Sequence, residues 1–264
     1  MEPSIPVAFF LLLFAATHIG LGTERVRGPL VARFGRWGFT WCFMAVAAVT
    51  FGLGVSYYAI HQAEGAPGLD LGRFEVARWV LVAATAVGVV LMAASFASYD
   101  RSPMALGGDE VREPYGIERV TRHPFFVGVF LLGASHALLA TRLVGAVAMG
   151  GLAVFVLVGA RFQDLKLLAR YGSPYADYLA GTSTLPFAAI ASGRQRLVWR
   201  ELPVAAPLVG LVLAYLLSAV HAQLFDHAGA YVIGGLVGLA LLVTLEEWRR
   251  ERRAGAPPTT RATV

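Results

Sequence analysis

Histidines are the side chains of this sequence best placed to do chemistry, because three of them fall within or at the edge of long apolar runs. These are His18, His123 and His136. An ionisable group at such a depth in a membrane is costly and is a functional hypothesis by default. A neutral imidazole is a good axial ligand of haem iron, and helix bundles build haem sites from facing side chains. Two of these histidines on different helices can therefore hold one haem.

The pairing depends on the level at which each histidine lies. His18 stands near the end of its apolar run. His136 lies 13 residues after His123 in the same run, which is roughly 20 Å along a helix axis. Both ligands of one iron must lie at the same level, and the residues alone leave open whether His18 pairs with His136 or with His123. We expect His61, His221 and His227, which stand near run ends, to be interfacial histidines.

A basic cluster precedes the fourth apolar run. Arg119 and Arg122 stand directly before His123 and Pro124. Proline suits the first turn of a helix, where its missing N–H is harmless. The two guanidinium groups are therefore expected at the mouth of that helix, where they can bind an anionic group of a cofactor, such as a haem propionate. The alternative is an anchor that contacts lipid phosphate.

The elements that carry these side chains are predicted to be transmembrane helices. Apolar residues make up 57% of the 264 residues and charged residues 15%, and the mean hydropathy is +0.63. About 20 apolar residues are needed to cross a bilayer as a helix, and backbone groups at that depth must be satisfied internally. Seven uncharged runs are long enough: Pro3–Thr23, Trp37–Ala63, Trp79–Tyr99, His123–Thr141, Leu143–Ala160, Leu202–Phe225 and His227–Leu245. The expected fold is an all-α bundle of about seven transmembrane helices.

Charge placement sets the orientation and excludes nucleic acid as the partner. All but three of the 22 basic residues fall in alternate connections and in the tail; the exceptions are Arg73, Arg78 and Arg142. Because basic connections stay cytoplasmic, the N-terminus is expected outside and the C-terminus inside. The net charge of +5 thus belongs to membrane topology, and the single cysteine, Cys42, excludes a cysteine-based metal site.

One cytoplasmic stretch, Arg161–Tyr178, reads as a helix that continues out of the fifth span and breaks at Gly172. Its apolar face is expected to hold Phe162, Leu165, Leu168 and Ala169, and its polar face Asp164, Lys166 and Arg170. It is either an amphipathic helix lying at the interface or a lid over a cytoplasmic pocket. The last residues, 249–264, are expected to be a disordered basic tail.

Five separated motifs, taken in order, resemble those of the NnrU family of bacterial membrane proteins. They are Thr17-His18-x-Gly20-Leu21, the arginine-rich turn from Arg25 to Gly35, Arg122-His123-Pro124, His136-Ala137-Leu138-Leu139-Ala140 and the stretch from Thr184 to Arg194. The resemblance covers residues 1–226 as a six-span domain and leaves 227–248 as an added transmembrane helix. The end of the fourth motif departs from the family pattern, since Thr141-Arg142 replaces its polar residues.

The resemblance implies a haem-linked function. The family is associated with denitrification and nitric oxide reductase activity, and its superfamily includes the haem b enzyme 15-cis-zeta-carotene isomerase. By motif, His18 and His136 resemble the iron ligands of that enzyme and His123 resembles a further functional histidine. The resemblance thus favours the pair His18 and His136 as metal ligands, with Arg119 and Arg122 as cofactor contacts and His123 as the catalytic residue.

The predicted function is an integral protein of the bacterial inner membrane that binds haem b between the first and fourth spans. It acts in nitric-oxide-linked redox chemistry or isomerises an apolar polyene or other lipid-like substrate. A partial resemblance of residues 116–180 to isoprenylcysteine and phospholipid methyltransferases gives an alternative that uses S-adenosylmethionine. A third reading is a non-enzymatic assembly factor for a respiratory reductase, so the sequence leaves open whether the protein is an enzyme.

Overall fold

The computed structural model describes residues 1–99, 102–103 and 110–253, and every regular element within them is helical. The expected all-α fold is confirmed. The α-helices are α1 (Ser4–Gly22), α2 (Glu24–His61), α3 (Glu75–Ala97), α4 (Pro124–Leu139), α5 (Leu143–Tyr171), α6 (Ser173–Gly181), α7 (Ala188–Ala191), α8 (Ala205–Ala219) and α9 (Asp226–Arg253). Short 3₁₀ turns join them: η1 (Leu71–Arg73), η3 (Gly116–Arg119), η4 (Trp199–Glu201) and η5 (His221–Gln223).

Five of these helices are long and apolar enough to cross a membrane: α1, α2, α3, α5 and most of α9. The helices that correspond to the fourth and sixth predicted spans, α4 and α8, have 16 and 15 residues and are shorter than a full crossing. Seven spans and the direction of the termini stay predictions.

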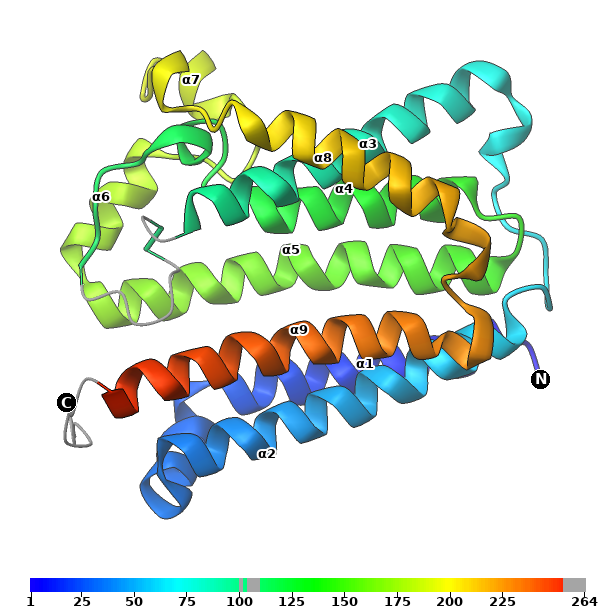
Figure 1. Ribbon diagram of the computed structural model, residues 1–264, viewed down its shortest axis with the longest axis horizontal. Coiled ribbons are helices and arrows are strands. Elements are labelled where there is room, and N and C mark those ends of the chain that lie inside the picture. The colour runs from blue at the N-terminus through cyan, green and yellow to red at the C-terminus, as the bar shows by residue number, and fades with distance from the viewer. Residues whose placement is uncertain (100–101, 104–109, 254–264) are drawn as a thin grey trace.

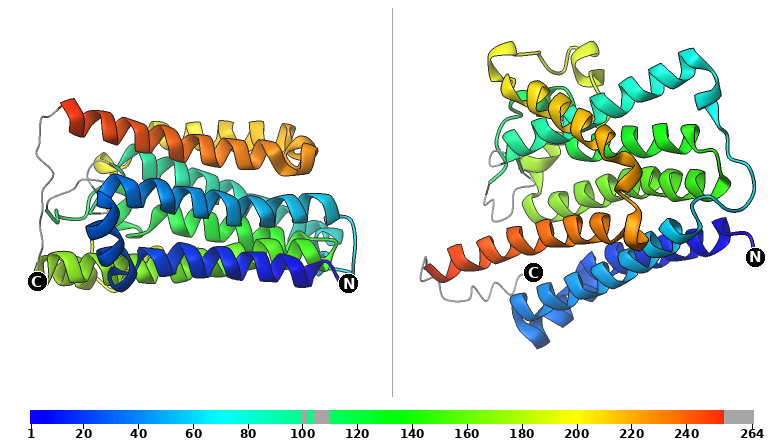
Figure 2. Two further views of the ribbon diagram at one scale, coloured as in Figure 1. Left: turned by 90° about the horizontal axis from the view of Figure 1, so that it is seen from below. Right: turned by 45° about the vertical axis from the view of Figure 1, so that its right-hand side comes forward.

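The long helices run side by side, with α5 between two groups (Figure 1). Helices α3, α4 and α8 lie on one side of α5, and α1, α2 and α9 lie on the other, as a second view also shows (Figure 2). Helices α6 and α7 lie at the end of the bundle where α4 begins and α5 ends, here called the α6 end. The opposite end, where α4 ends and η5 lies, is called the η5 end.

Small residues set the closest approaches between helices. A Cβ on Gly88 of α3 would lie 2.6 Å from the Gly128 carbonyl oxygen of α4, and a Cβ on Gly128 would lie 2.5 Å from the Gly88 carbonyl oxygen. Likewise, a Cβ on Gly133 of α4 would lie 2.8 Å from the Met149 carbonyl oxygen of α5. Helices in membranes gain their packing from such small-residue contacts, which here join α3, α4 and α5.

The helix α2 contains a break that the apolar pattern anticipates. Gly35 has φ 72° and ψ 166°, which separates an arginine-rich first part from the apolar second part. The predicted span starts at Trp37, directly after this break. A positive φ of this kind is readily adopted by glycine, which has no Cβ.

The predicted helix beyond the fifth span forms, but its predicted faces are wrong. Helix α5 continues to Tyr171, and the chain turns at Gly172 (φ 63°) into α6. Phe162 and Leu165 are exposed, whereas Asp164, placed by prediction on the polar face, is only 2% exposed. The reason is an ionic partner: Asp164 turns inward because it pairs with Arg122, directly before α4.

The C-terminal prediction needs one correction. The tail was expected to be disordered from residue 249, but α9 remains helical through Arg253. Residues 254–264 lie outside the described residues. At its start, α9 is interrupted at His227, Ala228 and Gly229, all with positive φ, next to the predicted boundary at residue 227.

Candidate functional site

Asp164 forms the centre of a buried polar cluster at the α6 end. Its Oδ2 accepts hydrogen bonds from Arg122 Nη2 at 2.9 Å and Nε at 3.1 Å. Its Oδ1 lies 2.8 Å from His123 Nε2 and accepts a hydrogen bond of 2.8 Å from the Tyr175 hydroxyl. The three donors come from the start of α4 and from α6. One carboxylate therefore ties α4, α5 and α6 together.

The chain before α4 is held in place by neighbouring backbone. The Thr121 hydroxyl donates to the Thr184 carbonyl oxygen at 2.7 Å, and Arg122 N–H donates to the Ser183 carbonyl oxygen at 2.9 Å. Helix α4 then begins at Pro124, as predicted, with His123 directly before it. The side chain of His123 is thus delivered to Asp164 by a fixed loop and a fixed helix start.

The ring of His123 is oriented by its acidic neighbour. His123 is 1% exposed. Its Nε2 faces the Asp164 carboxylate, and because a carboxylate oxygen can only accept a hydrogen bond, Nε2 must carry a proton; in the neutral ring that is the one N–H. Nδ1 then holds a lone pair, and this buried atom has no hydrogen-bond partner among the described residues. An oriented imidazole with a free nitrogen can accept a proton, accept a hydrogen bond or bind a metal.

Helix α6 covers this cluster. Tyr175 is fully buried and Tyr178 is 4% exposed, and their rings stack with centroids 5.5 Å apart. Burial, together with the adjacent Asp164 carboxylate, raises the pKa of Tyr175 well above 10. Tyr175 therefore acts only as a hydrogen-bond donor to Asp164. Helix α6 thus packs over the buried cluster, and the choice between an interfacial helix and a lid over a cytoplasmic pocket stays open.

A second acid, Glu118 of η3, is buried beside the cluster. Its carboxylate lies 3.5 Å from the Tyr115 N–H and near the Tyr178 hydroxyl, without an ordinary hydrogen bond to that hydroxyl. Burial raises the pKa of Glu118 from 4.5 to about 7, although hydrogen bonds from Ser102 and Tyr115 oppose this shift. The site thus contains a carboxyl group that titrates near neutral pH.

The two predicted anion-binding arginines are each paired with a carboxylate. Arg122 pairs with Asp164, as described above. Arg119 donates to Glu201 Oε2 at 2.7 Å through Nε and to Oε1 at 3.0 Å through Nη2, and to Gln195 at 2.6 Å. In this arrangement both guanidinium groups join parts of the chain to each other, and binding of a cofactor by either remains a prediction.

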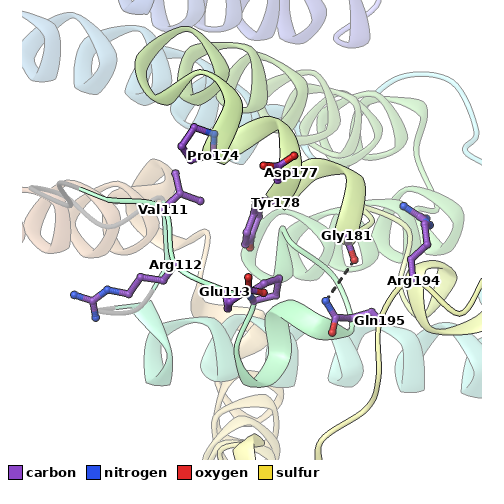
Figure 3. Close-up of a pocket in the computed structure, with 10 residues that line it drawn as sticks. Val111, Arg112, Glu113, Pro174, Asp177, Tyr178, Gly181, Arg194 and Gln195 are labelled. Carbon is purple, nitrogen blue, oxygen red and sulfur yellow. Dashed lines mark hydrogen bonds between the residues drawn. The ribbon is translucent and has the colours of Figure 1, made fainter.

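A polar crevice lies between α6 and the segments 111–114 and 194–195 (Figure 3). It has a volume of about 420 Å³, and Tyr178 lies in the middle of its wall. Gln195 donates a hydrogen bond of 3.4 Å to the Gly181 carbonyl oxygen across its edge. The lining residues are Val111, Arg112, Glu113, Pro114, Pro174, Asp177, Tyr178, Gly181, Arg194 and Gln195. This crevice reaches the back of the Tyr175–Tyr178 stack.

His18 lies in an aromatic environment on the other side of α5. Its ring centroid is 5.1 Å from that of Phe14, 4.9 Å from Phe43 and 5.8 Å from Phe155. Its Nδ1 is buried and has no hydrogen-bond partner among the described residues. His18 is therefore set among apolar side chains near the α6 end.

His18 and His136 lie in α1 and α4, which pack on opposite sides of α5 (Figure 1). The ring of His18 contacts Phe14, Phe43 and Phe155, whereas the ring of His136 contacts His221. His123 lies against Asp164 and Phe126. Each histidine thus has its own neighbours, and the pairing of two of them on one haem iron stays a prediction.

Sequence reasoning missed Asp164, Tyr175 and Glu118 as site residues. A signal was available for Asp164: it lies close after the fifth apolar run, on the same predicted side of the membrane as the basic cluster of Arg119 and Arg122, which could have supplied its counter-ion. Glu118 carries no comparable signal, because only the folded chain shows that it is buried.

Residues 7–228 match the NnrU protein family. The chain belongs to the NnrU family. Among curated proteins it is 29% identical to the chloroplastic 15-cis-zeta-carotene isomerase of Arabidopsis thaliana over 204 residues, which cover 74% of this chain and 52% of that protein. It is 30% identical to the Zea mays enzyme of the same name over 198 residues, which cover 70% of this chain and 50% of that one.

This NnrU protein thus spans about half the length of the curated relatives it matches. The family expected from the motifs is confirmed, and so is the similarity to the isomerase. No solved structure matches the chain significantly. Denitrification, haem b, S-adenosylmethionine and a reductase partner stay predictions.

Proposed function

We propose that this protein is a membrane-embedded cis–trans isomerase that acts on an apolar polyene. The observation that carries the proposal is the similarity to two 15-cis-zeta-carotene isomerases across about three quarters of the chain. The substrate class, a long conjugated hydrocarbon, also suits a protein whose exposed surface is formed by apolar helices.

An apolar groove between α1 and α5 supports a hydrocarbon substrate. It has a volume of about 410 Å³, and Gly151 in its wall lets the Leu11 side chain approach α5 closely, since a Cβ there would lie 2.6 Å from Leu11 Cδ1. Its walls are entirely apolar: Ala8, Leu11, Leu12, Ala15, Ile19, Val147, Gly151, Val154, Phe155 and Val158. Leu12 and Val154 are exposed at its rim, so a substrate dissolved in the bilayer can enter sideways. Phe155 links this groove to the ring of His18.

We assign His123 as the catalytic group of this proposal, which requires the polyene to extend beyond the lining of the apolar groove to the start of α4. Rotation about a double bond leaves the composition unchanged, so a group can lend a proton to the polyene and take the same proton back. In its imidazolium form, whose charge Asp164 can balance at Nε2, His123 carries that proton on Nδ1, and the same nitrogen receives it again when the rotated polyene releases it. Arg122 and Tyr175 hold Asp164 in position.

The proposed topology has seven spans, with the N-terminus outside and the C-terminus inside. The distribution of basic residues supports it, since the α6 end carries nearly all of them. Helices α4 and α8 are short, yet each packs along a full-length neighbour, α5 and α3 respectively. The multi-pass membrane location follows from the apolar helices, and the bacterial inner membrane remains a prediction.

The test is a direct isomerase assay. The purified full chain in lipid nanodiscs is given 15-cis-zeta-carotene, and the isomers are separated by liquid chromatography. We expect the wild-type chain to form product that is trans at the C15 double bond. His123→Ala should form at least tenfold less of it, and the exposed control His227→Ala should form wild-type amounts. The Zea mays enzyme prepared in parallel validates the assay. No product from this chain while that enzyme turns over would refute the proposal.

A further inference from the structure

A group of basic side chains lies beyond the end of the apolar groove between α1 and α5, at the α6 end. The group consists of Arg27 in the first turn of α2 and of Lys166 and Arg170 near the end of α5. We propose that the groove and this basic group together bind one anionic phospholipid, with an acyl chain in the groove and the phosphate at the three cations.

The groove leads toward the basic group because α1 and α5 run in the same direction. Leu11 of α1 lies against Gly151 of α5, and further along both helices His18 lies against Phe155. Helix α1 ends at Gly22, and α2 begins directly after it at the same end of the bundle (Figure 2). The chain therefore continues from the groove into Arg27 on one side and into Lys166 on the other.

The level of the basic group suits the head group of a lipid. Lys166 lies roughly 9 Å of helix beyond Ala160, the last residue of the predicted fifth span, and Arg170 follows one turn later. The polar layer of a bilayer begins where the hydrocarbon ends, and long basic side chains reach into it. A lipid whose acyl chain lies along the groove thus has its phosphate near these cations.

The charges of the basic group are close enough to act on one another. Partial desolvation, and after it the positive charges of Arg27 and Arg170, lowers the pKa of Lys166, while the charge of Glu24 opposes this shift. Glu24 lies 3.7 Å from Arg27, so one carboxylate faces three cations. The Lys166 ammonium has no hydrogen bond or ion pair within residues 1–99, 102–103 and 110–253. This excess of positive charge is complementary to an anionic group.

A phospholipid is the occupant that matches both parts of the region. The side chains that line the groove are all apolar, and Leu12 and Val154 at its rim are exposed toward the bilayer. Basic pockets between transmembrane helices bind the head groups of anionic lipids. A free phosphate would leave the groove unused. Since the polyene of the proposed function enters the same groove, the acyl chain and the polyene exclude each other there.

The experiment is a lipid titration followed by native mass spectrometry of the delipidated full chain in detergent. We expect the wild-type chain to retain one phosphatidylglycerol at concentrations at least about fivefold lower than it needs for phosphatidylcholine. The double variant Arg27→Gln, Lys166→Gln should lose this preference. The matched control Arg196→Gln, Arg200→Gln removes two exposed cations from the connection before α8 and should keep it.

Two further arms separate a lipid from a soluble phosphate. Val154→Trp places a larger side chain at the exposed rim of the groove and should weaken retention of phosphatidylglycerol while the cations are unchanged. Glycerol 3-phosphate has the phosphate but no acyl chain, so it should not displace the lipid at equal concentration. Circular dichroism spectra that match the wild-type spectrum establish that each variant remains folded.

Three results would overturn the inference. Equal retention of the two lipids by the wild-type chain, or a preference that survives in the double variant, would show that the basic group does not bind a lipid phosphate. Unchanged retention in Val154→Trp would remove the groove from the site. Displacement by glycerol 3-phosphate would assign the cations to a soluble phosphate. None of these measurements uses a polyene, so their outcome is separate from that of the isomerase assay.

Discussion

Asp164 explains why a charged residue is tolerated inside the bundle. A buried carboxylate is costly unless its charge is balanced and its oxygens are hydrogen-bonded. Arg122 balances the charge of Asp164, and His123 and Tyr175 occupy Oδ1. The carboxylate in turn fixes which nitrogen of His123 is free. At the residue scale, Asp164 is therefore a positioning residue for His123.

Asp164→Asn should lower stability more than a surface substitution of the same type. The amide keeps the shape but leaves the Arg122 charge without its counter-ion, and breaking a buried ion pair costs about 3 kcal/mol. We expect a clearly lower melting temperature in detergent, with Asp177→Asn on the exposed face of α6 as the matched control. Equal melting temperatures for the two variants would contradict the assigned role of Asp164.

Glu118 predicts a pH dependence of stability. Its folded-state pKa is raised from 4.5 to about 7 by burial, so the folded chain holds a proton that the unfolded chain has lost. The stabilisation is complete below pH 4.5, declines as the pH rises, and is lost above about pH 7. Glu118→Gln should remove this part of the pH dependence and be more stable than the wild-type chain at pH 8.

The measurement is the melting temperature of both proteins between pH 4.5 and 8. The informative quantity is the difference between wild type and Glu118→Gln at each pH, because every other titrating group is common to both proteins. This difference should shift in favour of the variant as the pH rises. A constant difference would mean that the carboxyl group of Glu118 does not titrate in this interval.

At the scale of elements, the sequence predicts most helices but not the faces they bury. Long apolar runs locate the apolar parts of α1, α2, α3, α5 and α9, because the need for internal backbone hydrogen bonds in lipid leaves few alternatives. They do not give the full lengths: α2 begins at Glu24, before its run, and α5 and α9 continue beyond theirs to Tyr171 and Arg253. The face of α5 near Asp164 is predicted wrongly, because apolar periodicity does not show that Arg122 and Tyr175 bind the Asp164 carboxylate and draw it to the buried side.

The contact between α3 and α4 leads to a prediction at the same scale. Gly88→Ala or Gly128→Ala places a methyl group 2.5 to 2.6 Å from the backbone oxygen of the other helix, so the helices must move apart. We expect a loss of about 2 kcal/mol in either variant, measured by thermal unfolding in detergent. Gly234→Ala in α9, where a methyl group meets nothing within 4 Å, is the control. If all three variants melt alike, close helix approach is not what requires these glycines.

At the scale of the whole molecule, helices that are distant in sequence build each end of the bundle. At the α6 end, the start of α4, the end of α5 and α6 form the buried cluster. At the η5 end, the end of α4 meets η5, which places His136 beside His221. The sequence identified His18, His123 and His136 as residues of interest, but it could not assign their neighbours. Neighbours depend on which helices pack together and at what level, and apolar runs do not encode either.

The proposed topology depends on whether the short helices α4 and α8 cross the membrane, and cysteine labelling can decide this. In a Cys42→Ser background, Arg112→Cys and Thr141→Cys lie on either side of α4, and Ser192→Cys and Gln223→Cys lie on either side of α8; all four positions are exposed. With seven spans, a membrane-impermeant maleimide added to intact spheroplasts should label positions 141 and 223 only, because basic connections stay inside. Positions 112 and 192 should react only after the membrane is opened.

Each failure of that pattern has a distinct structural meaning. If positions 112 and 141 label together from one side, α4 enters the membrane without crossing it, and His136 lies on the same side as His123. If positions 192 and 223 label together, α8 lies along the surface and α9 reverses its direction. Reaction of 112 and 192 but not of 141 and 223 in spheroplasts would instead invert the molecule, and the α6 end with its buried His123 cluster would then face the outside.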